Sequence, residues 1–191
     1  MQAAAGVVFV SWVAYWGLLG IEYLSAERRR RRDGDGSRRR ADNRSMGGLL
    51  LEFIAFATVC LFRRETAGQV PETLLWLAAL LAVLAVLMGA LPGRSLGREF
   101  RLQAMVTEDH RLATGGPYRV VRHPIYASLL ALLLATGITI TQWTALAVSV
   151  LIFLMGTEIR VRVEDALLAR RFGAEFDAYR KRTAAYIPFV R

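Results

Sequence analysis

The sequence predicts an all-α integral membrane protein with five transmembrane helices, two of them forming a hairpin in the C-terminal half, plus cytoplasmic helices. Two observations carry this prediction. The chain is 54% hydrophobic, yet it holds 25 Lys and Arg residues against 16 Asp and Glu. These two kinds of residue are also segregated, because long apolar runs alternate with Arg-rich segments. A soluble domain instead mixes apolar and polar residues at helical or strand period.

Three apolar runs, 3–24, 46–62 and 73–91, are each predicted to form one span, because a hydrocarbon core about 30 Å thick needs roughly 20 apolar residues. We expect the first run to be retained, since no basic segment of the signal-peptide kind precedes it. Glu52 lies inside the second run. An acid within a span is functional by default, but this one is close enough to the end of the run to reach the interface, so both interpretations stay open.

The last apolar run, 125–155, contains no charged residue and is too long for a single span. A polar stretch at 137–143 interrupts it halfway and ends in Trp143, a residue type suited to the membrane interface. We therefore predict a tight hairpin of two short helices, which brings the number of spans to five.

Loop charges predict the orientation. In a five-span arrangement the segments 25–45, 92–123 and 156–191 share one side of the membrane, and they hold 23 of the 25 basic residues. The positive-inside rule then places the C-terminus in the cytoplasm and the N-terminus outside. The excess of Arg over Lys suggests a bacterial genome, so we expect a bacterial inner membrane. We divide the chain into an N-terminal unit of three helices with its basic linker, 1–99, and a functional core, 100–191.

Composition also argues against other classes of function. The net charge of +9 suits nucleic acid, but basic cytoplasmic loops of a membrane protein account for it better, and we expect no nucleic-acid partner. One cysteine, Cys60, and two histidines, His110 and His123, offer too few ligands for a metal site. No Gly-rich phosphate loop lies between a strand and a helix, which argues against a Rossmann-type cofactor site.

The segment 115–126 concentrates polar side chains at the entrance of an uncharged helix. Two glycines and a proline set a turn, and Tyr, Arg and His residues then precede Pro124, which suits the first turn of a helix. A helix N-terminus with free N–H groups can hold an anion such as a carboxylate. An interfacial anchor would explain the same residue types, but not the Pro-Tyr, His-Pro and Tyr spacing.

A second polar segment follows the predicted hairpin. Arg160 and Glu164 lie one turn apart and share a helix face, and Glu158 and Arg162 form a similar pair on another face. Ordinary surface pairing would explain either pair alone. Residues 167–179 then give a helix an apolar side, which we expect to pack on the membrane-proximal core or to lie in the interface.

Together these motifs resemble a known family. Gly116-Pro-Tyr-Arg-Val-Val-Arg-His-Pro-Ile-Tyr126 resembles the G-x-Y-x-x-x-R-H-P-x-Y signature of the isoprenylcysteine carboxyl methyltransferases. Arg160-Val-Arg-Val-Glu-Asp-Ala-Leu-Leu168 resembles the R-x-x-x-E-E-x-x-L segment of that family, and 172–188 is similar to its closing FG, Y and (I/L)P pattern. The match covers about 100–189, and earlier residues agree in hydropathy alone.

The resemblance implies an S-adenosyl-L-methionine-dependent methyltransferase that binds its cofactor on the cytoplasmic side without a Rossmann domain. It implies that Arg160 faces the methyl acceptor. The cofactor contacts that it implies are Gln103, His110, Arg111, Leu112, Ala113, Tyr118, His123, Pro124, Ile125, Tyr126 and Glu164.

Two positions depart from the family pattern. Asp165 stands where the family usually has a second Glu, and Ala127-Ser128 follows the last Tyr of the signature, where a Gly is common. We expect neither departure to involve the core ligands.

Physical chemistry is consistent with these roles. Glu164 can pair with the cationic or hydrogen-bonding groups of S-adenosylmethionine, and the histidines and the helix start can hold its carboxylate. A carboxylate acceptor needs no general base. A hydroxyl acceptor does, and His123, His110 and Glu164 are the candidates.

The methyl acceptor stays open at this stage. We expect a lipophilic molecule that arrives from the bilayer and is O-methylated on a carboxylate or a hydroxyl. Phospholipid N-methylation and an NADPH-dependent reduction of the sterol-reductase type are the enzymatic alternatives. A membrane adaptor whose Arg clusters hold anionic lipid is the non-enzymatic one.

Overall fold

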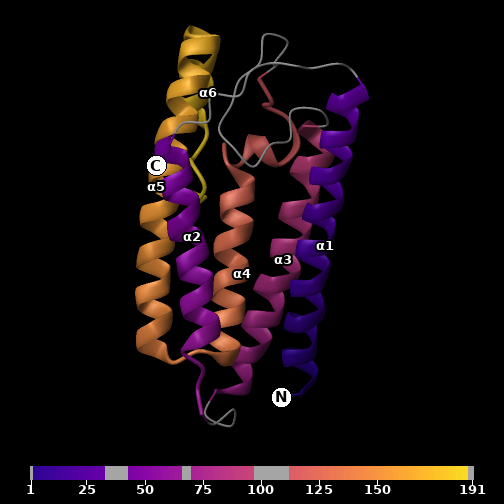
Figure 1. The fold of residues 1–191 in the computed structure, drawn as a ribbon, viewed down its shortest axis with the longest axis vertical. Helices are drawn as coiled ribbons and strands as arrows, with labels where there is room; N and C mark the ends of the chain where they lie inside the picture. Colours follow the sequence, from indigo (N-terminus) through magenta and orange to yellow (C-terminus); the bar gives the residue numbers. More distant parts are fainter. Residues whose placement is uncertain (1, 33–42, 66–69, 97–111, 189–191) are drawn as a thin grey trace.

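The computed structural model describes residues 2–32, 43–65, 70–96 and 112–188. All of its regular elements in these ranges are helices, and the long ones run along one axis (Figure 1). They are α1 (Gln2–Arg32), α2 (Asn43–Leu61), α3 (Glu72–Leu96), the 3₁₀ turn η3 (Gly116–Arg119), α4 (Pro124–Ile140), α5 (Trp143–Phe172) and α6 (Ala174–Arg182).

Within the described residues, four helices are long and apolar enough to cross a membrane: α1, α2, α3 and α5. Helix α4 is also apolar, but it has 17 residues and is the shortest of the five. At about 1.5 Å per residue it covers roughly 26 Å, slightly less than a typical hydrocarbon core. The predicted all-α membrane class is confirmed, and the predicted hairpin is the pair α4–α5.

The second helix of that hairpin is longer than the sequence predicts. Helix α5 has 30 residues and continues without a break from the apolar run into the polar segment that holds Glu158 and Asp165. No proline interrupts it, and Ala, Leu, Glu and Arg dominate its last turns, which favours continued helix. At roughly 45 Å it exceeds the thickness of a hydrocarbon core, so its final turns extend beyond the apolar bundle.

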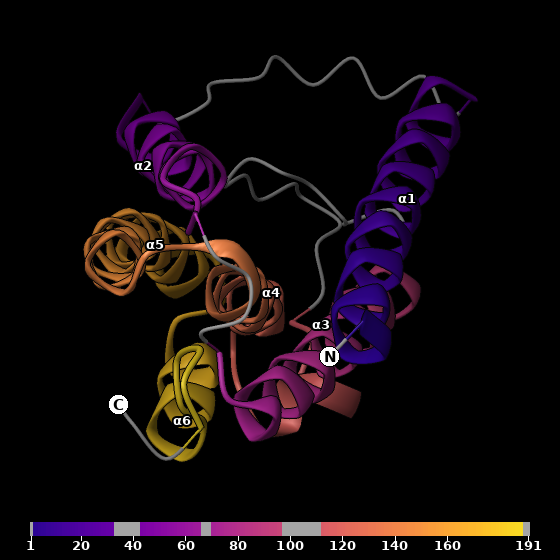
Figure 2. The ribbon, with the colours of Figure 1, turned by 90° about the horizontal axis from the view of Figure 1, so that it is seen from below.

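The other long helices pack around the α4–α5 hairpin. Helix α2 packs on α5, α3 packs on α4, and α1 packs on α3. Seen along the bundle, α1 and α2 lie on different sides of α4 and α5 (Figure 2). Fully buried apolar residues such as Ala82, Leu132 and Phe153 fill the contacts, whereas Phe9 and Phe53 remain about 70% exposed at the outer surface. Apolar side chains on the outside suit a lipid environment.

One end of the bundle is closed by backbone contacts between two loops. Arg64 N donates to Ile140 O at 2.8 Å, and Gln142 N donates to Phe62 O at 3.1 Å. The Arg64 guanidinium lies 4.6 Å from the ring centroid of Trp143. These contacts hold the end of α2 against the α4–α5 turn and satisfy polar groups that the turn would otherwise leave unpaired.

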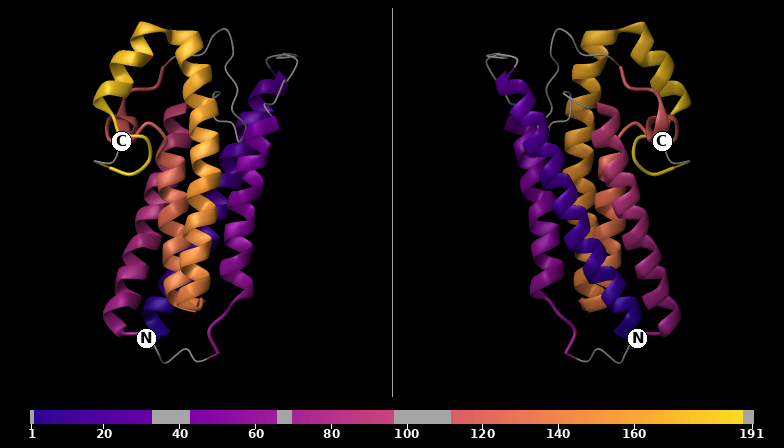
Figure 3. Two further views of the ribbon diagram at one scale, coloured as in Figure 1. Left: turned by 90° about the vertical axis from the view of Figure 1, so that its left-hand side faces the viewer. Right: turned by 90° about the vertical axis from the view of Figure 1, so that its right-hand side faces the viewer.

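At the opposite end, the chain reverses after α5 and covers the loop before α4 (Figure 3). Gly173, with φ of +52°, allows the sharp change of direction into α6. Phe176 and Tyr179 on α6 are buried, and the Tyr179 hydroxyl donates to Tyr118 O at 2.6 Å. The apolar side predicted for this region therefore packs onto the loop that carries the signature motif.

Candidate functional site

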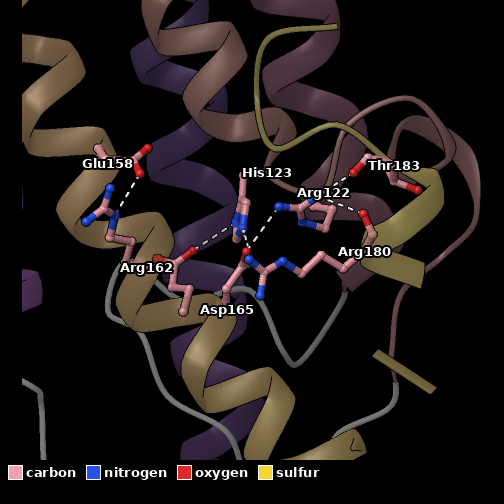
Figure 4. A network of polar contacts seen from close by, with 8 residues as sticks. Arg122, His123, Glu158, Arg162, Asp165, Arg180 and Thr183 are labelled. Atoms are coloured by element: carbon pink, nitrogen blue, oxygen red, sulfur yellow. Dashed lines mark hydrogen bonds and ion pairs between the residues drawn. The ribbon is translucent and has the colours of Figure 1, made fainter. Parts of the chain in front are cut away.

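The two polar segments singled out in the sequence meet at this end of the bundle. His123, immediately before α4, presents Nδ1 to Glu164 Oε2 at 3.1 Å and Nε2 to Asp165 Oδ1 at 2.9 Å, both on α5. Figure 4 shows the imidazole directed at the Asp165 carboxylate. The sequence prediction required His123 and Glu164 to lie close together, and in the structure they are in direct contact.

The histidine is held as a cation. Burial opposes the charged form and lowers the pKa of His123, but the hydrogen bonds that the ring donates to Asp165 and Glu164 outweigh burial and raise its pKa to about 9. At neutral pH both ring nitrogens therefore carry protons and donate to the two carboxylates. A histidine engaged in this way has no lone pair available to accept a proton from a substrate.

Asp165 corrects one sequence expectation. We had expected this departure from the family pattern not to involve the core ligands, but its carboxylate bonds directly to His123. Its second oxygen accepts a hydrogen bond from Arg122 Nη2 at 3.1 Å, and Arg122 Nη1 donates to Thr183 O (Figure 4). The acid thus links the start of α4 to α5, and through Arg122 to the segment after α6.

Fewer backbone N–H groups are free at the start of α4 than the sequence suggested. Arg122 N donates to Ala184 O at 2.8 Å, and His123 N donates to Ala185 O at 2.9 Å. Tyr126 N is already bonded to His123 O at 3.1 Å. We had expected free N–H groups here that could hold an anion, but these three are occupied, two of them by the C-terminal segment that returns alongside the loop and the third by His123 O.

Tyr126 connects this cluster to Arg160. Its hydroxyl donates to Glu164 Oε1, and its ring centroid lies 5.1 Å from the guanidinium carbon of Arg160. Such a position over an aromatic face is favourable for a cation. Tyr126, Arg160 and Glu164 therefore form one connected group on α4 and α5, as the shared helix face of the last two suggested.

Arg160 also forms a buried ion pair with α2. Its Nη1 lies 2.8 Å from Glu52 Oε2, and the Thr157 hydroxyl donates to Glu52 Oε1 at 3.1 Å. The side chains of Arg160 and Glu52 are only 6% and 5% exposed. The sequence left open whether Glu52 reaches the interface, and the structure places it inside the bundle with a charged partner.

Two glycines make that pairing possible. A Cβ on Gly48 would lie 2.5 Å from Arg160 Cγ and 2.6 Å from Gly156 O, and a Cβ on Gly156 would lie 2.6 Å from Gly48 O. Helices α2 and α5 therefore approach each other as closely as glycine allows. Glu52 and Arg160 each follow one of these glycines by a single turn.

Comparison with known proteins assigns the family. The sequence model of the phospholipid methyltransferases matches residues 73–175, more than half of the chain. The chain belongs to the phospholipid methyltransferase family. The resemblance to isoprenylcysteine carboxyl methyltransferases is confirmed as well, because relatives named protein-S-isoprenylcysteine O-methyltransferase match part of this chain in sequence.

Relatives with different names are similar to part of this chain. The nickel-cobalt-cadmium resistance protein NccN of Alcaligenes xylosoxydans xylosoxydans is 33% identical over 114 residues, which is 59% of this chain and 52% of the relative. The protein-S-isoprenylcysteine O-methyltransferase of Schizosaccharomyces pombe is 30% identical over 83 residues, 44% of this chain and 35% of the relative. The chain thus spans about half or less of the length of these relatives.

A solved structure shows the same fold. The eukaryotic intramembrane Ras methyltransferase ICMT (isoprenylcysteine carboxyl methyltransferase) matches with a TM-score of 0.53 and 16% identity, over 96% of this chain and 68% of that chain. Together with the apolar helices, this likeness identifies the fold of a multi-pass membrane protein.

The remaining predicted site residues are only partly within the described residues. Tyr118 is buried in η3, Pro124 is buried at the start of α4, and Ile125 packs against the core. Leu112 and Ala113 are half-buried in the loop before η3. Gln103, His110 and Arg111 lie outside the described residues.

Sequence reasoning missed three members of this network: Arg122, Thr157 and Asp165. Asp165 carried a signal, since an acid directly follows Glu164 at a position where the family has a carboxylate. Arg122 lies within the signature motif, but nothing in its spacing indicated the carbonyl groups that it contacts. Among the described residues, no group of three or more His, Cys, Asp or Glu side chains is placed to hold a metal ion.

Proposed function

We propose that this protein is an S-adenosyl-L-methionine-dependent methyltransferase that O-methylates a lipophilic acceptor at the cytoplasmic face of the membrane. The observation that carries the proposal is the contact of His123 with Glu164. It joins the signature loop and the polar end of α5 into one site, and both segments lie within the family match.

The residues present suit the cofactor. S-adenosylmethionine has cationic groups, which a carboxylate can bind. The side chain of Glu164 is 22% exposed, whereas those of Asp165 and Glu52 are 11% and 5% exposed. Glu164 is therefore the acid of this network that a bound molecule can reach, and His123 and Tyr126 fix its orientation. When bound, the cofactor supplies an activated methyl group on its sulfonium.

The protein contributes positioning and exclusion of water, which are the main requirements of an in-line displacement. Arg160 orients the acceptor and offsets its charge. A carboxylate acceptor is favoured over a hydroxyl, because His123 is protonated and both of its nitrogens are engaged. His123 therefore cannot serve as the general base that a hydroxyl acceptor would need.

The location of the site supports an acceptor that arrives from the bilayer. The final turns of α5 extend beyond the span, and Glu164 lies on them. The described segments at this end carry most of the basic residues, whereas Arg63 and Arg64 lie near the other end. This distribution favours a cytoplasmic site and an external N-terminus in a bacterial inner membrane.

Phospholipid N-methylation is the second candidate, favoured by the description of the matching family model. An amine acceptor must lose a proton before or during transfer. The two candidates therefore differ in their need for a base, and they can be separated by the class of product formed.

The test is titration of the purified protein in lipid nanodiscs with S-adenosylhomocysteine, by isothermal calorimetry. We expect saturable binding, about tenfold weaker in a Glu164→Gln variant. Incubation of membranes with radiolabelled S-adenosylmethionine, followed by base hydrolysis, separates methyl esters from N-methylated lipids. Absence of binding at millimolar S-adenosylhomocysteine, together with tight binding of NADPH, would replace the proposal by a reductase function.

A further inference from the structure

Glu52 is a buried carboxylate on a helix that the family match does not include. The match begins at residue 73, whereas α2 ends at Leu61. Both carboxylate oxygens of Glu52 are engaged, one by Thr157 and one by Arg160, and both partners lie on α5. Moving a carboxylate out of water costs free energy of desolvation, so an acid buried within a membrane-spanning helix indicates a functional role.

The local packing is organised around this pair. The missing side chain of Gly48 leaves room for the aliphatic stem of Arg160, and that of Gly156 leaves room for the backbone of Glu52. The two helices run in opposite directions, so each glycine on one helix lies beside the charged residue of the other (Figure 1). The side chain of Arg160 is thereby confined to a narrow range of positions over α2.

The same arginine belongs to the proposed site. Its guanidinium lies over the ring of Tyr126, whose hydroxyl bonds to Glu164, and Glu164 bonds to His123. Acids and cations alternate along this path, from Glu52 through Arg160, Glu164 and His123 to Asp165. The carboxylate on α2 is therefore continuous with the groups assigned to cofactor and acceptor.

We propose that Glu52 is a positioning residue, which holds the guanidinium of Arg160 in the orientation that receives the acceptor. This inference rests on the proposed function. Without the Glu52 carboxylate, the long side chain of Arg160 gains rotamer freedom, and the acceptor must supply the ordering that Glu52 now provides. We expect loss of the Glu52 carboxylate to impair turnover of the acceptor more than binding of the cofactor, because among the described residues the hydrogen bonds and ion pair of Glu52 go to Thr157 and Arg160 and not to Glu164 or His123.

The test compares the full-length wild type with Glu52→Gln, Glu52→Asp and Glu158→Gln in nanodiscs. Glu158 is the matched control, since it pairs with Arg162 at the same 2.8 Å on the exposed face of α5. The probes are S-adenosylhomocysteine for binding, and N-acetyl-S-farnesylcysteine with radiolabelled S-adenosylmethionine for turnover. We expect Glu52→Gln to lower kcat/KM for this acceptor by about 30-fold, with an affinity for S-adenosylhomocysteine within about twofold of wild type.

Glu52→Asp restores the negative charge on a side chain that is shorter by one methylene. It should recover at least about a third of the loss in kcat/KM that Glu52→Gln causes, measured on a logarithmic scale. Glu158→Gln should stay within about twofold of wild type in both measurements. If Glu52→Gln fails to fold, Thr157→Val removes one of the two contacts to Glu52 and keeps its charge. That variant is expected to lower kcat/KM by about threefold to tenfold, without changing cofactor affinity.

Three outcomes overturn the inference. Turnover by a folded Glu52→Gln variant within about threefold of wild type excludes a positioning role. Equal losses of cofactor affinity and turnover indicate a purely structural role. A wild-type protein that binds S-adenosylhomocysteine but methylates no farnesylcysteine rejects the carboxylate acceptor, and this inference with it. A wild-type protein that does not bind S-adenosylhomocysteine rejects the proposed function itself.

Discussion

Nε2 of His123 lies 2.9 Å from Oδ1 of Asp165, and both side chains are largely buried. This contact joins the residue before α4 to a residue near the end of α5, which are 42 positions apart in the sequence. Because the other ring nitrogen binds Glu164, the imidazolium connects two neighbouring carboxylates that would otherwise repel each other. The stability of this end of the bundle should therefore depend on the charge of one histidine.

The first prediction concerns pH. The pKa of His123 rises from its ordinary value of 6.5 to about 9 in the folded protein, so between these values the folded state binds more protons than the unfolded state. The stabilisation is complete below about pH 6.5 and is lost as the pH rises through 9. The thermal unfolding midpoint in detergent should fall between pH 6.5 and 9.5, and a His123→Gln variant should lose most of that slope.

Tyr179 does not complicate this experiment. Burial raises its pKa to about 12, above the range scanned. A midpoint that stays constant or rises between pH 6.5 and 9.5 in the wild type would contradict the protonated state of His123.

The second prediction concerns the charge of Asp165. Asp165→Asn leaves Arg122 and His123 buried without their shared carboxylate, and removal of one partner from such a group costs about 3–5 kcal/mol. We expect a marked fall in the unfolding midpoint. Asp165→Glu keeps the charge and should be the milder change, measured by the same thermal scan.

Glu158→Gln provides the comparison for Asp165→Asn. It removes a carboxylate from an ion pair on the same helix whose side chains are 46% and 77% exposed, and it should change stability by less than about 1 kcal/mol. Similar midpoints for Asp165→Asn and Glu158→Gln would show that the buried network contributes little.

The sequence was sufficient to predict the elements and the meeting of the two motifs. Apolar runs of membrane length indicate helices directly, and the His-Pro motif and Glu164 can be recognised by type and spacing. The interhelical contacts could not be predicted in this way. Nothing local to Glu52 specifies that Arg160, 108 positions away, faces it, because that depends on how closely α2 and α5 approach at Gly48 and Gly156.

Similarly, two of the N–H groups expected to be free at the start of α4, those of Arg122 and His123, are bonded to a distant segment. Ala184 and Ala185 supply the carbonyl acceptors, and alanine carries no side-chain signal for such a role. The full length of α5 was underestimated for a different reason. Hydropathy marks the end of an apolar run, but a helix continues through polar residues as long as its propensity allows.

The third prediction concerns the ion pair between α2 and α5. Arg160→Ala leaves the Glu52 carboxylate buried without a cation, at a cost of about 3–5 kcal/mol. The double variant Glu52→Gln with Arg160→Gln removes both charges and keeps two groups that can hydrogen-bond. It should therefore be more stable than Arg160→Ala, as judged by the unfolding midpoint in detergent. A double variant that is no more stable would show that the charge of Glu52 is not the source of the loss.

The fourth prediction concerns Gly48 and uses its neighbour as the control. A methyl group at Gly48 would overlap the stem of Arg160 and the backbone at Gly156, so Gly48→Ala should force α2 and α5 apart and destabilise the protein by about 1–3 kcal/mol. A methyl group at Gly47, on the same helix, meets nothing within 4 Å, and Gly47→Ala should be neutral or stabilising by up to about 1 kcal/mol. Both variants have the same composition and can be compared by thermal unfolding. Because Gly48→Ala also displaces Arg160, it should lower turnover more than it lowers the affinity for S-adenosylhomocysteine. If the two alanine variants unfold at the same temperature, the close contact between α2 and α5 does not exist in the membrane.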